Sequence, residues 1–113
     1  MSNEDLSRQK CEACDGQTPV LDRHEAARLK AQLNEDWEFN EDHREIRRAF
    51  KFKNFYHTIE FVNAVAWIAN REGHHPDLEA GYNRCLVRFS THAIGGLSRN
   101  DFICAAKVDE LFR

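Results

Sequence analysis

The stretch from Asn54 to Gly73 constrains the fold most, because it predicts one long amphipathic helix with both ends marked. Asn54 is of a residue type that caps helix N-termini, and Gly73 followed by Pro76 is a typical C-terminal stop. Between them, apolar residues recur at helical spacing. The main stripe contains Phe55, Ile59, Val62, Ala66 and Ala69, and Phe61, Val65 and Ile68 widen it. We therefore expect a helix that buries one side against the rest of the chain.

Shorter elements are predicted on both sides of this helix. Ser98 with Asp101 has the spacing of a capping box, and Asp22 with Glu25 forms a similar pair. The expected elements are helices over about 23–33 and after Ser98, and strands around 37–39, 46–52 and 82–90. The order α-β-β-α-β-β-α indicates a small α+β domain, with an antiparallel sheet of about four strands and three helices packed on one face.

The strand expected over 46–52 carries a basic run that is no nucleic-acid patch. Its apolar residues share one face and most of its basic residues share the other, which is typical of a strand with a solvent face. Arg48 falls on the apolar face, and the sequence offers no explanation for it. The net charge of −3 gives no electrostatic reason to expect nucleic acid.

The length of 113 residues allows one domain. Residues 1–20 are polar and without periodicity, so we expect a mobile N-terminal arm before a folded domain over 21–113. The most apolar stretch, Phe61–Ala69, is too short to span a membrane, and Met1–Lys10 lacks the apolar core of a secretory signal. We therefore expect a cytoplasmic protein with reduced thiols.

Four cysteines divide into an N-terminal pair and two single residues. Cys11 and Cys14 form a Cys-x-x-Cys, which could be half of a zinc site or a redox pair. The sequence has no second such pair to complete a zinc site. The motif also does not follow a strand in a βαβ unit, which argues against a redox pair. We favour a bystander pair, and we interpret Cys85 and Cys104 as small core residues.

Histidines are concentrated in predicted loops and strand ends. His74 and His75 follow the long helix, and His92 follows the strand over 82–90. Histidine titrates near neutral pH, so such a group can move protons. Because His75 precedes a proline, its backbone is pushed toward extended conformations, and adjacent side chains then point to opposite sides. We expect His74 and His75 on one wall of a cleft, without a shared metal, and His92 on the other wall.

The pattern resembles the pterin-4a-carbinolamine dehydratase family over roughly Leu21–Phe112. The residues that carry the resemblance are Gly73-His74-His75-Pro76, Tyr82-Asn83, Ser90-Thr91-His92, Gly96-Leu97-Ser98 and Asp101, supported by Trp37 and Phe52-Lys53-Asn54-Phe55. The resemblance implies a lyase that dehydrates 4a-hydroxytetrahydrobiopterin, the product of aromatic amino acid hydroxylases, to quinonoid dihydropterin. It implies no metal and no cofactor.

The resemblance also suggests roles for the site residues. We expect His74 and His92 to act as acid and base and His75 to bind and orient the pterin. The chain around Gly73, and around Ser90, Thr91 and Ala93, is expected to contact the substrate. Asp101 either orients a histidine or caps the last helix, and the sequence favours neither.

One position departs from the family pattern. A charged residue is common four positions before the first histidine, and this chain has Asn70 there, which can form a hydrogen bond but supplies no charge. Glu72 is a nearby residue that could supply the charge instead.

The resemblance further implies a homo-oligomer, dimer or tetramer, and phenylalanine hydroxylase as a functional partner. The alternative functions are a non-catalytic pterin-binding or transcriptional co-regulator protein, or an enzyme acting on another pterin.

Overall fold

The structure is a computed structural model that describes residues 5–13 and 16–112, so Cys14 lies outside the described residues. The helices are α1 (Arg23–Lys30), α2 (Phe55–Glu72) and α3 (Arg99–Asp109), and the strands are β1 (Glu38–Phe39), β2 (Ile46–Lys51), β3 (Asp77–Ala80) and β4 (Arg84–Phe89). Short 3-10 turns lie at Leu6–Arg8, His92–Ile94 and Glu110–Phe112. In the described part of the chain the four strands form one antiparallel sheet in the order β1-β2-β4-β3.

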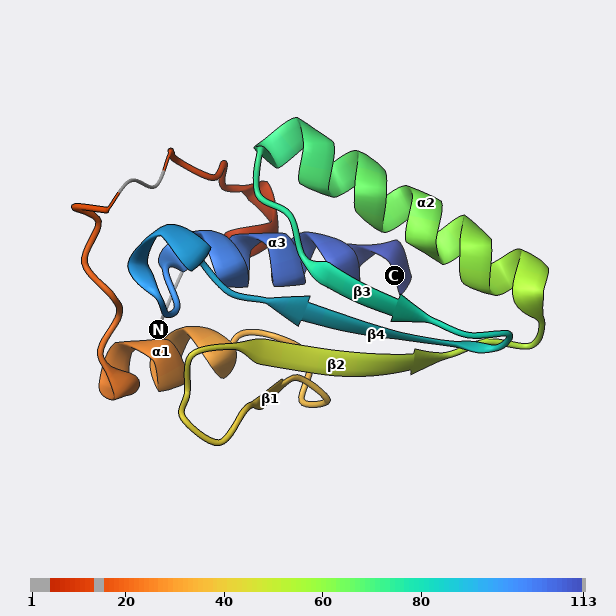
Figure 1. Ribbon diagram of the computed structural model, residues 1–113, viewed down its shortest axis with the longest axis horizontal. Coiled ribbons are helices and arrows are strands. Elements are labelled where there is room, and N and C mark those ends of the chain that lie inside the picture. The colour runs from red at the N-terminus through yellow and green to blue at the C-terminus, as the bar shows by residue number, and fades with distance from the viewer. Residues whose placement is uncertain (1–4, 14–15, 113) are drawn as a thin grey trace.

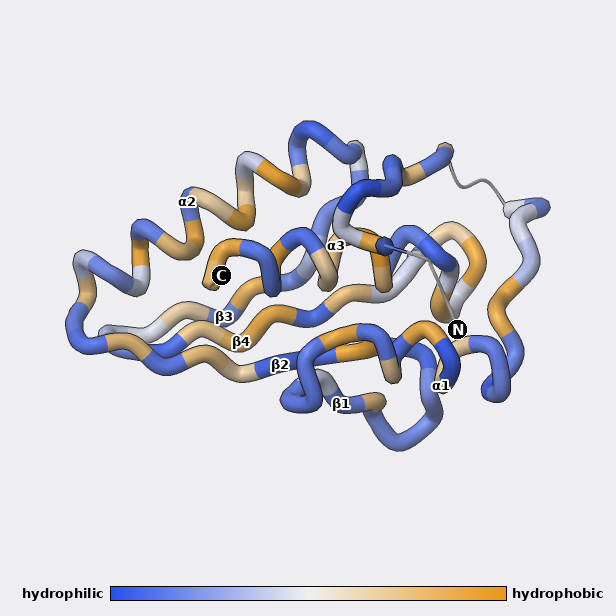
Figure 2. Tube along the Cα trace, turned by 180° about the vertical axis from the view of Figure 1, so that it is seen from behind, coloured by the Kyte–Doolittle hydropathy of each residue, from blue (hydrophilic) through white to orange (hydrophobic). Residues whose placement is uncertain are grey.

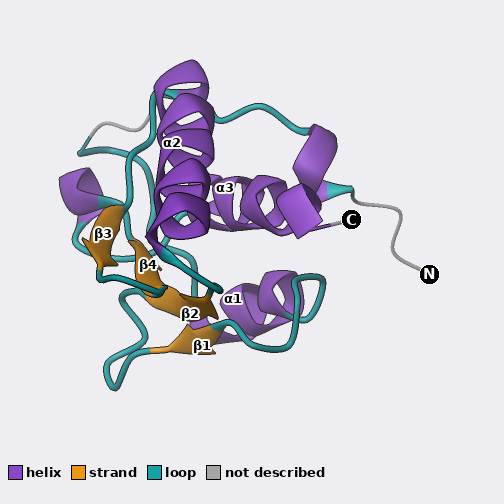
Figure 3. Ribbon diagram, turned by 90° about the vertical axis from the view of Figure 1, so that its right-hand side faces the viewer, coloured by secondary structure: helices purple, strands orange, loops and turns teal. Residues whose placement is uncertain are grey.

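The three helices cover one face of the sheet, which confirms the predicted α+β architecture (Figures 1 and 3). β4 lies in the interior of the sheet and alternates buried with half-buried or exposed residues, so that Cys85, Val87 and Phe89 face the helices. Ile46 and Phe50 do the same on β2. The short strand β3, to which the sequence pattern assigned no range, borders β4 on the outside.

Helix α2 has the predicted ends but a different buried side. The Asn54 side chain accepts a hydrogen bond from the His57 backbone N–H at 3.0 Å, and Gly73 ends the helix at a left-handed φ of 66°. The buried residues are Thr58, Phe61, Val65, Ile68 and Ala69. Phe55 and Ala66, expected in the main stripe, are exposed. Figure 2 shows apolar bands recurring along α2. Phe61, Val65 and Ile68, which widened the predicted stripe, are buried in the core.

Arg48, unexplained by the sequence, reaches a carboxylate on α3. Its Nη1 donates to Asp109 Oδ1 at 2.7 Å, and the indole Nε1 of Trp37 donates to the same oxygen at 2.8 Å. Both side chains of the ion pair are only 14% exposed. A buried cation is tolerated on the inner face of β2 because a buried anion meets it there.

The first described segment of the expected N-terminal arm, residues 5–13, packs against α3. Leu6, in the 3-10 turn, is buried in the core, and Lys107 Nζ donates to the Ser7 carbonyl at 2.8 Å. Isolated apolar anchors in a polar stretch leave no periodicity, which is why the sequence indicated an arm without fixed structure. No helix in the described residues is long and apolar enough to cross a membrane.

Removal of the Asp109 carboxylate tests this packing. Asp109→Ala leaves the buried guanidinium of Arg48 and the indole N–H of Trp37 without their acceptor, so we expect the free energy of unfolding to fall by about 3 kcal/mol in urea denaturation. The matched control is Asp36→Ala, because Asp36 lies 3.7 Å from Arg48 but is 68% exposed. The control should change stability by less than about 1 kcal/mol. Equal losses in the two variants would contradict this assignment.

Candidate active site

A pocket of about 460 Å³ opens where the end of α2 meets the end of β4. Gly73 turns the chain out of α2 in the left-handed conformation, so that His74 and His75 follow at once on one side. The chain leaving β4 supplies the other side through the 3-10 turn His92–Ile94. The lining residues are Glu12, Ala13, Glu72, Gly73, His74, His75, Ser90, Thr91, His92, Ala93 and Asn100.

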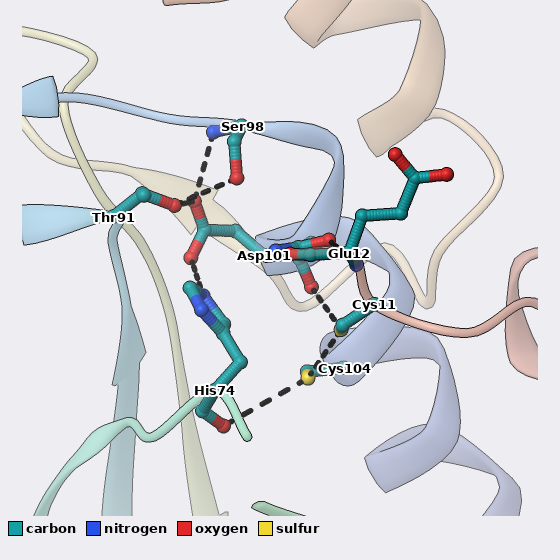
Figure 4. Close-up of polar contacts among 8 residues, drawn as sticks. Cys11, Glu12, His74, Thr91, Ser98, Asp101 and Cys104 are labelled. Carbon is teal, nitrogen blue, oxygen red and sulfur yellow. Dashed lines mark hydrogen bonds and ion pairs between the residues drawn. The ribbon is translucent and has the colours of Figure 1, made fainter. Parts of the chain in front are cut away.

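His74 is fixed by a buried carboxylate beneath the pocket. Its Nε2 lies 2.6 Å from Asp101 Oδ1, and the Asp101 side chain is fully buried while that of His74 is 11% exposed (Figure 4). The imidazole also lies nearly parallel to the ring of Phe89, with centroids 6.2 Å apart. A carboxylate can only accept, so Nε2 carries the proton of this bond, and in the neutral ring Nδ1 is the proton-accepting nitrogen.

The second oxygen of Asp101 holds the end of β4 and the start of α3. Oδ2 accepts from Thr91 Oγ1 at 2.7 Å and from the Ser98 backbone N–H at 3.0 Å (Figure 4). Since Thr91 uses its hydroxyl proton on the carboxylate, it must accept from Ser98 Oγ, 2.7 Å away. Asp101 therefore does both of the things between which the sequence could not choose: it caps α3 and it holds a histidine.

His75 takes a different partner. Its Nε2 lies 3.0 Å from Oδ1 of Asn70, which belongs to the last turn of α2, and the His75 side chain is exposed. The position that departs from the family pattern thus pairs with the second histidine and not with the first. Donation from Nε2 to the amide oxygen fixes the orientation of the His75 ring.

Glu72 lines the pocket but makes its contacts away from the histidines. Its Oε1 accepts from the Cys11 backbone N–H at 2.9 Å, and Oε2 lies 3.8 Å from Lys107 Nζ. This carboxylate therefore ties the N-terminal segment to the end of α2. The contact is made to a backbone N–H, and for that reason the sequence carried no sign of it.

The predicted site residues lie together: all of them line the pocket except Asp101, which is buried behind the lining. Gly73, His74, His75, Ser90, Thr91, His92 and Ala93 line the pocket, and Asp101 lies beneath it. Glu12, Ala13 and Asn100 also line it, and the sequence did not indicate them. The other three histidines lie elsewhere: His24 is exposed on α1, His43 stacks on Phe39, and His57 pairs with Glu60. Among the residues described, no group of three or more metal-ligating side chains is placed to hold a metal ion.

Comparisons with known proteins agree with the resemblance. The family model described as "Pterin 4 alpha carbinolamine dehydratase" matches residues 19–111. A protein of Legionella pneumophila (strain Corby), provisionally named pterin-4-alpha-carbinolamine dehydratase, is 60% identical over 107 residues, which are 95% of each chain. A protein of Nitrosomonas europaea with the same provisional name is 53% identical over 109 residues, covering 96% of this chain and 95% of that one.

Solved structures share the fold. The crystal structure described as a transcriptional coactivator/pterin dehydratase from Brucella melitensis superposes with a TM-score of 0.77 at 29% identity, covering 82% of this chain and 98% of that one. A pterin dehydratase-like protein described as a RuBisCO assembly factor in the alpha-carboxysome gives a TM-score of 0.60 at 22% identity, covering 69% and 90%, a likeness of fold alone. The family match over residues 19–111 and the relatives of similar length show that this chain belongs to the pterin-4a-carbinolamine dehydratase family.

Proposed function

We propose that this protein is a hydro-lyase that removes water from 4a-hydroxytetrahydropterin to give quinonoid dihydropterin, the recycling step after an aromatic amino acid hydroxylase. The observation that carries the proposal is the pocket in which His74, His75 and His92 meet, with His74 held by a buried carboxylate. Membership of the family supports the pterin as the substrate class.

The reaction needs two proton transfers and the residues offer two imidazoles for them. The departing 4a-hydroxyl must be protonated, and a ring N–H of the pterin must lose a proton as the C–O bond breaks. Side chains positioned for such transfers contribute about 10²–10⁴-fold. His74 and His92 come from opposite sides of the pocket, one after α2 and the other after β4, so a flat substrate between them meets one on each side.

Asp101 divides the roles of these two histidines. Because Nε2 of His74 donates to the carboxylate, Nδ1 is free of a proton in the neutral ring, and His74 is suited to accept the ring proton. His92 is exposed on the turn after β4, and in its protonated form it is suited to donate to the leaving hydroxyl. His75, oriented by Asn70, binds and positions the pterin.

Alanine variants of the three histidines test these roles. We expect His74→Ala and His92→Ala each to lower kcat by about 10²-fold, because each removes one proton-transfer group. His75→Ala should chiefly raise KM, by about tenfold, because it removes a binding contact. The measurement is stopped-flow decay of carbinolamine absorbance, with the substrate generated in place by an aromatic amino acid hydroxylase. His57→Ala, on the exposed side of α2, is the matched control and should keep full activity. Full activity in the His74 and His92 variants would contradict the proton-transfer roles proposed for these two histidines.

A second prediction concerns Asp101 as a positioning residue. Asp101→Asn replaces one accepting oxygen by an N–H₂ donor, so it cannot accept from His74, Thr91 and Ser98 together. We expect kcat to fall by about 10²-fold or more with KM within about threefold, because the His74 ring loses its fixed tautomer while the pocket lining stays. Circular dichroism and thermal melting accompany the kinetics. A variant that is folded and keeps the wild-type kcat would contradict a role for this carboxylate through His74.

Binding of a macromolecular partner is the second candidate function. The Brucella relative is described as both a transcriptional coactivator and a pterin dehydratase, and this chain exposes Tyr56 and Trp67 on α2 and Tyr82 beside it. Exposed aromatic side chains are typical of interaction surfaces, and the outer edge of β3 has no strand partner among the described residues.

A homo-oligomer is proposed on the same grounds. Light scattering on the purified chain would give a mass above one protomer, and a monomer would contradict this.

A further inference from the structure

Two thiols from opposite ends of the chain meet beside the pocket. Cys11 Sγ lies 3.4 Å from Cys104 Sγ, although 93 positions separate the two residues (Figure 4). Cys104 is fully buried on α3, and its sulfur lies 4.0 Å from the His74 carbonyl oxygen. Cys11 is partly exposed on the N-terminal segment. The proposed dehydration uses neither of them.

The N-terminal segment is held at this place by contacts on both sides of the thiol. The Cys11 backbone N–H donates to Glu72 Oε1 at 2.9 Å. The next residue is clamped by one amide: the Glu12 N–H donates to Asn100 Oδ1 at 3.0 Å, and Asn100 Nδ2 donates to the Glu12 carbonyl at 2.6 Å. The short distance between the sulfurs is therefore supported by backbone contacts that do not involve sulfur.

We propose that Cys11 and Cys104 form a reversible disulfide when the protein meets a peroxide. A disulfide needs sulfurs about 2.05 Å apart, so the pair must approach by roughly 1.4 Å, a movement that side-chain rotation and a small shift of the partly exposed segment can supply. The pair differs from the Cys-x-x-Cys read in the sequence, because the partner of Cys11 comes from α3.

The oxidation proceeds in two steps that balance. Cys11, the partly exposed thiol, reacts first. Its thiolate attacks one peroxide oxygen, the O–O bond breaks, and the departing hydroxide takes up the proton that the thiol had lost, so Cys11 becomes a sulfenic acid and one water leaves. Cys104 then attacks the sulfur of Cys11, the S–O bond breaks, and the hydroxyl leaves as a second water with the Cys104 proton. Two thiols are oxidised and one peroxide is reduced to two waters.

Burial sets the order of these steps. The hydrogen bond with Cys11 and burial raise the pKa of the Cys104 thiol, so Cys104 stays protonated and shielded until its neighbour has reacted. The product joins the N-terminal segment covalently to α3. Glu12 and Ala13 line the pocket, so the link fixes one of its walls.

Mass spectrometry of the full-length protein tests the proposal. After treatment with a small excess of hydrogen peroxide, we expect an intact mass two hydrogens below that of the reduced protein. After alkylation of the remaining free thiols, digestion should give a linked Cys11–Cys104 peptide, and dithiothreitol should reverse the link. The melting temperature should rise by at least about 5 °C on oxidation, because the link closes a long loop. The experiment uses no dehydratase assay, so its result does not depend on whether the protein has the proposed activity.

Three variants give the controls. Cys104→Ala should abolish both the linked peptide and the rise in melting temperature, while Cys85→Ala, a buried cysteine on β4, should retain both. Cys14→Ser should also retain the link. A Cys11–Cys14 peptide in the wild type, oxidation that stops at unlinked sulfinic acid, or no reaction with peroxide would each overturn the proposal.

Discussion

The site depends on one fully buried carboxylate. Asp101 accepts from the imidazole after α2, from the hydroxyl at the end of β4 and from the backbone at the start of α3, so one side chain fixes three segments that come from different parts of the chain. A buried charge is costly unless its hydrogen bonds are made, and here both oxygens are used. The same bonds that satisfy the charge therefore determine where His74 lies and which of its nitrogens carries the proton.

Local signals in the sequence predicted the elements that rest on local chemistry. Asn54 and Gly73 mark the ends of α2 through caps that a few neighbouring residues define, and the alternation along β4 predicted its buried face. The family resemblance located the pocket residues. The side of α2 that is buried differs from the predicted one. Phe55 lies outside the core and stacks on Tyr82, whereas Thr58 is buried and donates to the Tyr82 carbonyl.

Contacts between distant segments could not be predicted. Arg48 pairs with Asp109 on α3, 61 positions away. The N-terminal segment is held by backbone groups and by the side-chain amide of Asn100. Such contacts leave no periodic trace, because any residue supplies a backbone N–H. For this reason Glu12 and Ala13, which lie before the residues matched to the family, were missed as pocket residues, and Cys11 was assigned to a motif instead of to Cys104.

The most direct test of the account is stopped-flow measurement of carbinolamine decay with the unmodified protein. The account predicts that the decay rate rises in proportion to protein concentration, above the rate in buffer, because His74 and His92 transfer protons at the bound pterin. A folded protein that leaves the decay at the buffer rate would contradict the enzyme assignment, and the pocket would then have to be explained by binding alone.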